Sequence, residues 1–237
     1  MKLSAPIFRL KRQAKLLARE SDVPLHTALD RLARHEGFHA WSHLAASASD
    51  HKPAHEMLAR LSPGDLVLLG ARPGHGKTLM GLELAIEAVR TDRPAFFFTL
   101  EDTEGLVFDR LQMLGTDRKM VEDKLTVDTS DDICADHIID RIGHGSPGVL
   151  AIIDYLQLLD QRRRNPELDV QIRALRTFAS ATGSIIVVLA QIDRAFETTG
   201  RNIPGLEDIR LPNPLDISLF TKACFMHGGE AHLEKID

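Results

Sequence analysis

The sequence predicts an α/β fold in which a doubly wound, mostly parallel sheet follows a small helical module. After residue 63, short apolar runs alternate with stretches of helical periodicity. The runs are apolar throughout rather than at every second residue, so the sheet should be covered on both faces. Near the end of the chain, two strand-like segments flank Gly228-Gly229, a pattern typical of a β-hairpin.

The expected elements follow one another along the body of the chain. Parallel strands are expected at residues 66–69, 95–100, 149–153 and 184–190, with a weaker one at 125–127. Helices are expected between them at 77–90, 104–114, 131–142 and 168–182. The hairpin strands are expected at 218–227 and 231–236. This order is typical of a sheet with helices on both sides.

The first 50 residues have helical periodicity and form the expected helical module, residues 1–50, ahead of a domain at 51–237. One helix is expected at 6–20, a second from Pro24 to Gly37, and a third, short one around Trp41. The small, polar stretch 45–52 reads as a linker. Basic residues lie outside the apolar stripe of the first helix: Arg9, Arg12, Lys15 and Arg19.

The composition limits the classes of protein to which the chain can belong. The chain has 237 residues, of which 43% are hydrophobic, enough for a buried core. No apolar run reaches the roughly 18 residues of a membrane span, and the N-terminus lacks the apolar centre of a secretory signal. Cys134 and Cys224 have no metal-binding or redox spacing. We therefore expect a cytoplasmic protein with reduced thiols and no membrane partner.

Charge is unevenly distributed. The net charge is −5. Residues 1–60 contain ten basic and six acidic side chains, whereas residues 61–237 contain 19 basic and 28 acidic ones. Because the body is acidic, any contact with nucleic acid should come from local basic loops or from the basic front around Arg9, Lys11, Arg12, Lys15 and Arg19.

A phosphate-binding loop is predicted within LVLLGARPGHGKTLM, residues 66–80. An apolar strand enters a turn rich in Gly and Pro, whose main-chain N–H groups can face phosphate oxygens at the start of a helix. Lys77 is expected to reach the β- and γ-phosphates, and the Thr78 hydroxyl to bind Mg²⁺. The strict pattern has Gly where this chain has Ala71. The predicted nucleotide-binding residues are Gly70, Ala71, Arg72, Pro73, Gly74, His75, Gly76, Lys77, Thr78 and Leu79.

Polar residues at the ends of three other strands could complete a nucleotide-hydrolysing site. Asp154 follows VLAII, Glu101 follows AFFFTL, and Gln191 follows SIIVVLA. Carboxyl ends of parallel strands meet at one edge of a sheet, where acids can bind Mg²⁺ and activate water. An amide can detect the γ-phosphate by hydrogen bonding. Asp102 and Glu104 remain alternatives to Glu101.

Five segments together resemble the C-terminal domain of DnaB-type replicative helicases, among the RecA-like ATPases. They are GARPGHGKT at 70–78, FTLE at 98–101, IIDYLQLLD at 152–160, LAQIDR at 189–194 and LEDIR at 206–210. They occur in family order from about residue 54 onward, and Ala71 is usual in that family. The resemblance implies a RecA-like fold and an ATP- and Mg²⁺-dependent ATPase. In it Lys77, Glu101 and Gln191 act in catalysis, and Thr78 and Asp154 hold the metal.

The resemblance also implies partners. Helicases of this type form rings around single-stranded DNA, with two loops facing the channel. Arg162, Arg163 and Arg164 match the first loop, and the stretch 192–210, in which Arg201 is the expected contact, matches the second. The chain departs from the family at both ends, because the front segment is unrelated and the lysine and arginine that act on a neighbour's nucleotide are not both present. Candidates for that role are Lys235, Lys222 and Arg194.

Three functions fit these features. The first is a DnaB-helicase-like ATPase that acts on single-stranded DNA as a ring or filament. The second is a regulatory ATPase similar to KaiC-like or RadA-like proteins, which controls a partner without unwinding DNA. The third is a nucleotide-binding adaptor with negligible turnover. Stimulation of ATPase activity by single-stranded DNA distinguishes the first from the others.

Overall fold

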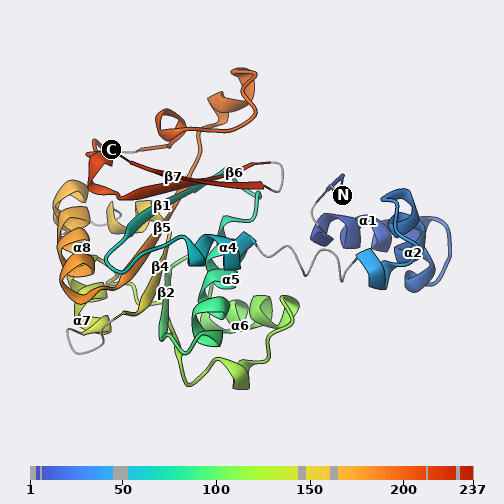
Figure 1. The fold of residues 1–237 in the computed structure, drawn as a ribbon, viewed down its shortest axis with the longest axis horizontal. Helices are drawn as coiled ribbons and strands as arrows, with labels where there is room; N and C mark the ends of the chain where they lie inside the picture. Colours follow the sequence, from blue (N-terminus) through green and yellow to red (C-terminus); the bar gives the residue numbers. More distant parts are fainter. Residues whose placement is uncertain are drawn as a thin grey trace. The chain divides into compact units, whose positions relative to one another are not determined.

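The computed structural model describes residues 4–5, 7–44, 53–143, 148–160, 165–211, 213–227 and 230–236. The chain divides into two compact units, Met1–Pro53 and Ala54–Asp237. Figure 1 shows a few helices in the first unit and a sheet flanked by helices in the second. Among the described residues, none of the helices has both the length and the apolar character needed to cross a membrane.

A seven-stranded sheet forms the centre of the second unit, in the order β3-β2-β4-β5-β1-β6-β7. Six strands run parallel, and β7 pairs antiparallel with β6. The chain crosses from β1 to β2 and later returns to place β5 between β4 and β1. The strands are β1 (Leu66–Ala71), β2 (Ala95–Thr99), β3 (Leu125–Asp128), β4 (Leu150–Asp154), β5 (Ile185–Gln191), β6 (Lys222–His227) and β7 (Glu230–Lys235).

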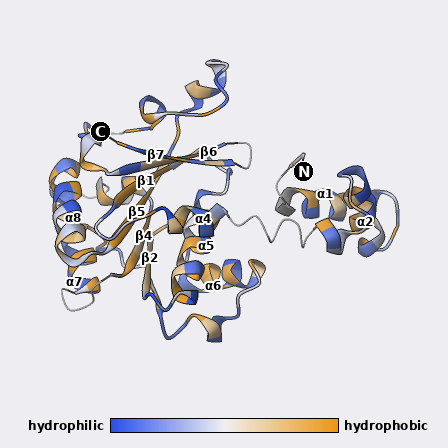
Figure 2. Ribbon diagram, viewed as in Figure 1, coloured by the Kyte–Doolittle hydropathy of each residue, from blue (hydrophilic) through white to orange (hydrophobic). Residues whose placement is uncertain are grey.

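Two hydrophobic cores lie on opposite faces of this sheet. On β1, Leu66 and Leu68 belong to one core, while Val67 and Leu69 belong to the other. The first core contains α7 (Ala135–Ile142) and α8 (Leu168–Thr182); the second contains α4 (Pro53–Ala59), α5 (Lys77–Arg90) and α6 (Glu104–Met113). Because both faces are covered, the central strands are apolar throughout, as Figure 2 shows in orange. The expected mostly parallel, doubly wound α/β sheet is confirmed.

Short 3₁₀ helices occupy several connections: η1 (Arg118–Met120), η2 (Leu156–Asp160), η3 (Arg194–Thr198), η4 (Leu206–Asp208) and η5 (Ile217–Leu219). The segment 192–210, which contains η3 and η4, begins directly after β5. Its two ends meet, because Ile192 and Ile209 form an isolated antiparallel bridge. It is therefore a closed lobe at the carboxyl edge of the sheet.

The first unit contains α1 (Ile7–Glu20) and α2 (Leu25–His35), followed by a helical turn at residues 41–44. Leu10, Ala33 and Leu44 form its small core. Gly37, with φ +85°, ends the second helix region in the left-handed conformation that glycine adopts most readily. Lys11, Arg12, Lys15 and Arg19 are all exposed on α1. The expected linker at 45–52 lies outside the described residues.

Two elements start four residues later than the sequence pattern predicts, and one helix was not expected. Strand β6 starts at Lys222 rather than at residue 218, because Ile217–Leu219 form η5, in which the Ser218 N–H donates to the Asp216 side chain. Helix α7 starts at Ala135 rather than 131, since the Asp128 and Ser130 side chains accept main-chain N–H groups of 130 and 132 and hold a turn there. Helix α4 was not expected, because its seven residues are too few to show a period.

Candidate nucleotide-binding site

The predicted phosphate loop connects β1 to α5 at the carboxyl edge of the sheet. Gly76 precedes the helix with φ +87°, which a residue with a side chain rarely adopts. Gly70 is needed for another reason: a Cβ there would lie 2.9 Å from Ile192 Cδ1 and 3.1 Å from the Phe225 ring. Ala71, by contrast, fits within β1 in a fully buried position. The departure from the strict glycine pattern therefore costs nothing in packing.

An open pocket of about 340 Å³ lies over this loop. Its lining brings together the loop and residues from three other elements: Pro73, Gly74, Gly76, Lys77, Thr78, Leu79, Glu101, Arg110 and Gln191. Gly70, Ala71, Arg72 and His75 belong to the predicted loop but do not line this pocket. The N-terminus of α5 therefore borders the pocket, where its partial positive charge and free N–H groups favour binding of an anion.

Lys77 is the electrostatic centre of the site. Its Nζ lies 2.9 Å from Asp154 Oδ1 and 3.5 Å from Glu101 Oε2, and 4.8 Å from the centre of the Tyr155 ring. Lys77 is 7% exposed and Asp154 is fully buried, at the end of β4. A buried cation and a buried anion stabilise each other here, since neither has water to solvate it. Strand ends far apart in sequence therefore meet as predicted.

The residues present fit a Mg²⁺-nucleotide complex. Asp154 Oδ2 is buried and has no hydrogen-bond partner among the described residues, although its sister oxygen binds Lys77. An unsatisfied buried carboxylate oxygen is costly unless a ligand compensates it. Thr78, the first residue after Lys77, lines the pocket over the phosphate loop. A hydroxyl and a carboxylate are the hard oxygen ligands that Mg²⁺ prefers.

The structure separates the three acids that follow β2. Glu101 lines the pocket and its side chain is 42% exposed, so it can reach solvent and substrate. Asp102 is buried and accepts a hydrogen bond of 2.9 Å from Arg110 Nη2. Glu104 lies in the first turn of α6, where it pairs with Arg118 at 3.1 Å. Of the three acids, only Glu101 contacts Lys77, which favours Glu101 as the residue that orients the attacking water.

Arg110 is a site residue that sequence reasoning missed. It projects from α6 into the pocket, held by Asp102. A lone arginine in a helix gives no signal of its own, since most such arginines are solvated. Arg110 follows Glu101 by nine residues in the sequence. It lies beside the phosphate loop as a second cation only because α6 folds back over the strand ends.

Gln191 is the last residue of β5 and lines the pocket together with residues of the phosphate loop. It pairs in register with Ala71, so the two strands end side by side. The lobe 192–210 is attached to it: Arg210 N–H donates to the Gln191 carbonyl at 2.8 Å, and Ile192 N–H donates to the Ala71 carbonyl at 3.0 Å. Gln191 is thus placed between the pocket and the lobe.

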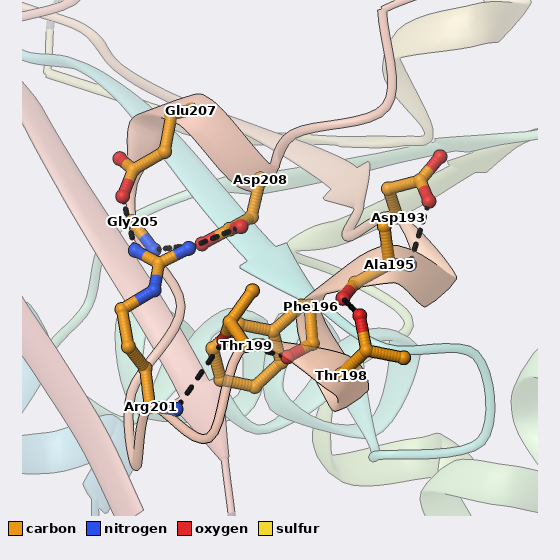
Figure 3. A network of polar contacts seen from close by, with 9 residues as sticks. All are labelled: Asp193, Ala195, Phe196, Thr198, Thr199, Arg201, Gly205, Glu207 and Asp208. Atoms are coloured by element: carbon orange, nitrogen blue, oxygen red, sulfur yellow. Dashed lines mark hydrogen bonds and ion pairs between the residues drawn. The ribbon is translucent and has the colours of Figure 1, made fainter.

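Arg201, the expected DNA contact of this lobe, is paired with acids within it. Figure 3 shows its guanidinium directed at Glu207 and Asp208, and the Nη2–Asp208 Oδ1 distance is 2.5 Å. Its guanidinium also lies over the Phe196 ring, 5.6 Å from the centre. The side chain is 40% exposed, which leaves part of it facing solvent. Arg162, Arg163 and Arg164 lie outside the described residues.

The three candidates for contact with a neighbouring subunit differ in exposure. Lys222 is 7% exposed and forms an ion pair with Asp65, while also donating to the Arg60 carbonyl at 3.1 Å. The Lys222 charge is therefore paired inside the domain, and the side chain cannot reach a neighbouring subunit. Lys235 and Arg194 are both exposed.

The chain is similar to several known proteins in sequence and in fold. Residues 116–214 match the family described as DnaB-like helicase C terminal domain. A replicative DNA helicase DnaB of Helicobacter pylori is 29% identical over 210 residues, covering 73% of this chain and 43% of the relative. A probable plasmid replicative DNA helicase of Chlamydia trachomatis is 27% identical over 195 residues, covering 68% and 43%. The matched region is thus less than half the length of these relatives.

Two solved structures share the fold. One is an isolated ATPase domain, which aligns with a TM-score of 0.58 and 16% identity, covering 78% of this chain and 86% of that one. The other is a DnaB-like replicative helicase, whose structure was described with its interactions with primase. It aligns with a TM-score of 0.59 and 16% identity, covering 97% and 73%. In motifs, in sequence and in fold, this chain is therefore similar to the C-terminal domain of DnaB-like helicases.

Proposed function

We propose that the chain binds and hydrolyses Mg-ATP at this pocket and acts on single-stranded DNA as a ring or filament. The observation that carries the proposal is the convergence at the phosphate loop of Lys77, the first residue of α5, with Glu101, Asp154 and Gln191 from the carboxyl ends of β2, β4 and β5. This is the constellation that phosphoryl transfer to water requires: a cation, a metal-binding acid, a base and a sensor. A cytoplasmic location fits such a DNA-directed activity.

Each side chain has a distinct role in the proposed reaction. Lys77 donates to the β- and γ-phosphate oxygens, exchanging its contact with Asp154 for them. Thr78 and Asp154 would hold Mg²⁺, which would supply positive charge for the phosphate oxygens. Glu101 accepts a hydrogen bond from the attacking water and orients it, and Gln191 hydrogen-bonds the γ-phosphate. Arg110, which also lines the pocket, adds positive charge near the transferred group.

A second candidate function is a regulatory ATPase that controls a partner without unwinding DNA. The burial of Lys222 favours it, because it removes one of the residues that could act on a neighbour's nucleotide. The acidic composition of residues 61–237 also points away from a body that attracts DNA generally.

The ATPase rate with and without single-stranded DNA tests the proposal. A DNA-acting enzyme should show a several-fold higher turnover when the DNA is added, with saturation at a defined DNA concentration. Turnover that is indifferent to DNA would favour the regulatory ATPase. A chain that binds ATP without turnover would be an adaptor.

A further inference from the structure

An ion pair joins the phosphate loop to the lobe 192–210. Arg72, which directly follows β1, donates from Nε at 3.1 Å and from Nη2 at 2.5 Å to the same oxygen of Glu197, in η3. The two residues are 125 positions apart in sequence. The Arg72 residue is 8% exposed, whereas the Glu197 side chain is 60% exposed. The contact therefore anchors an outer lobe to a buried cation.

Aromatic contacts form a second connection beside this ion pair. His75, in the phosphate loop, stacks on His227 at the end of β6, with ring centres 5.7 Å apart and planes 24° apart. Phe196, the neighbour of Glu197, contacts the His227 ring in an edge-to-face arrangement, with ring centres 5.3 Å apart. Phe196 is 2% exposed. The phosphate loop and η3 are thus held together by charge and by packing.

The lobe is attached to the pocket through Gln191. The main-chain hydrogen bonds from Ile192 to Ala71 and from Arg210 to Gln191 fix both ends of the lobe to the strand ends. A displacement of η3 away from Arg72 would therefore pull on the backbone on either side of Gln191. Neither Arg72 nor Glu197 lines the pocket itself, so any effect they have on catalysis must pass through this connection.

We propose that Glu197 and Arg72 form a positioning pair that holds η3 against the phosphate loop and so fixes Gln191 relative to bound nucleotide. The proposal deepens the function proposed above and rests on it for its kinetic consequence. Its structural consequence, that loss of the Glu197 charge loosens the phosphate loop, needs no nucleotide.

Burial explains why this pair matters more than an ordinary surface ion pair. Arg72 Nη1 is buried and has no hydrogen-bond partner among the described residues, so the guanidinium is already incompletely satisfied. Removing the Glu197 charge leaves a buried cation without its anion, which is the costly way to break such a pair. Removing Arg72 as well takes the unpaired cation away. The two substitutions should therefore be non-additive.

The kinetic test compares Glu197→Gln with Glu207→Gln in the full chain. Both glutamates lie in the lobe, both are mostly exposed, and each pairs with one arginine; only Glu197 reaches the phosphate loop. We expect Glu197→Gln to lower kcat for ATP about 3- to 10-fold, the scale of a charge-assisted contact reduced by solvent screening. ADP affinity should change less than about twofold, because the Lys77 contacts remain. The double variant Arg72→Gln/Glu197→Gln should be no slower than the slower single variant.

Hydrogen exchange without nucleotide gives a readout independent of activity. In Glu197→Gln, amides of residues 74–77 and 194–198 should exchange faster while those of β4 keep the wild-type rate. In Glu207→Gln, the increase should be confined to residues 201–208. The proposal is wrong if the 74–77 amides of Glu197→Gln exchange at the wild-type rate, or if both variants lower kcat equally. A wild type without ATPase activity would instead refute the proposed function, and the exchange measurement would still decide this one.

Discussion

Lys77 Nζ donates to Asp154 Oδ1 over 2.9 Å, and the lysine is held between this fully buried carboxylate and the exposed carboxylate of Glu101. The Lys77 ammonium group, which is proposed to bind phosphate, thus has a carboxylate partner in the free protein. Nucleotide phosphates would replace the Asp154 contact, and the released carboxylate oxygens would then be available to a cation. The same pair therefore contributes both to the stability of the free protein and to binding, and mutations must separate the two.

Replacing Lys77 by Met should abolish ATP binding, because a neutral side chain cannot donate to the phosphates. It should also destabilise the protein by about 3 kcal/mol, since Asp154 is left as an uncompensated buried charge. The double variant Lys77→Met/Asp154→Asn removes both charges and should recover most of the stability without recovering binding. Titration calorimetry and thermal unfolding measure the two effects. ATP binding by the single variant at wild-type affinity would contradict the phosphate-loop assignment.

Replacing Glu101 by Gln should leave ATP binding intact and lower turnover by about 10²-fold or more, the scale of losing a general base. The control is Glu104→Gln, three residues away on α6, where the acid pairs with Arg118. That variant should turn over at close to the wild-type rate. Single-turnover hydrolysis with saturating ATP gives the comparison. Equal rates for Glu101→Gln and wild type would move the base to another acid.

Stability should decline at low pH through the buried pair of Asp65 and Lys222. Burial raises the pKa of Asp65, but hydrogen bonds from Lys222, the Ser62 N–H and Thr221 outweigh it and lower the pKa below its usual value. A carboxyl whose pKa is lower in the folded state stabilises the fold above its unfolded pKa. That contribution is lost as pH falls through the folded value.

The substitution Asp65→Asn tests this pH dependence. Its unfolding temperature should lie below that of the wild type at pH 7, and the gap should narrow as pH falls below about 4. Thermal unfolding at a series of pH values measures it. A gap that stays constant down to pH 3 would show that the Asp65 charge does not carry the effect.

The phosphate loop and the acids at the strand ends could be predicted because local pattern fixes them. A continuous apolar run followed by Gly-Lys-Thr must leave the sheet at its carboxyl edge, and Asp154 and Gln191 follow runs of the same kind. Glu197 and Arg110 could not be predicted, because their partners lie 125 and eight residues away and depend on how the lobe and α6 fold back. Lys222 was considered for an external role because sequence does not reveal its partner Asp65.

Self-association should be favoured by nucleotide, because RecA-like sites are normally completed by a neighbouring subunit through head-to-tail contacts. Sedimentation at several protein concentrations, with and without a non-hydrolysable ATP analogue, should show a shift to larger species with the analogue. Lys77→Met/Asp154→Asn, which should not bind nucleotide, is the control and should not shift. A chain that stays monomeric at high concentration with analogue and DNA, while turning over at full rate, would refute this prediction.

Binding of single-stranded DNA should depend on one of two basic regions, which separate substitutions can distinguish. If Arg162, Arg163 and Arg164 contact the strand, replacing all three by Ala should abolish DNA-stimulated ATPase activity and preserve basal turnover. Each lost phosphate contact should also reduce the slope of log K against log salt by about 0.7.

If instead the front binds DNA, replacing the exposed Lys11, Arg12, Lys15 and Arg19 by Ala should remove binding. A matched control replaces Arg90, Lys119 and Lys124, which are exposed bases elsewhere on the second unit, and should bind normally. Salt-titrated fluorescence anisotropy with a labelled oligonucleotide decides between the regions. Wild-type binding by both variants, or no binding by the intact chain, would overturn the helicase-like function in favour of the regulatory ATPase.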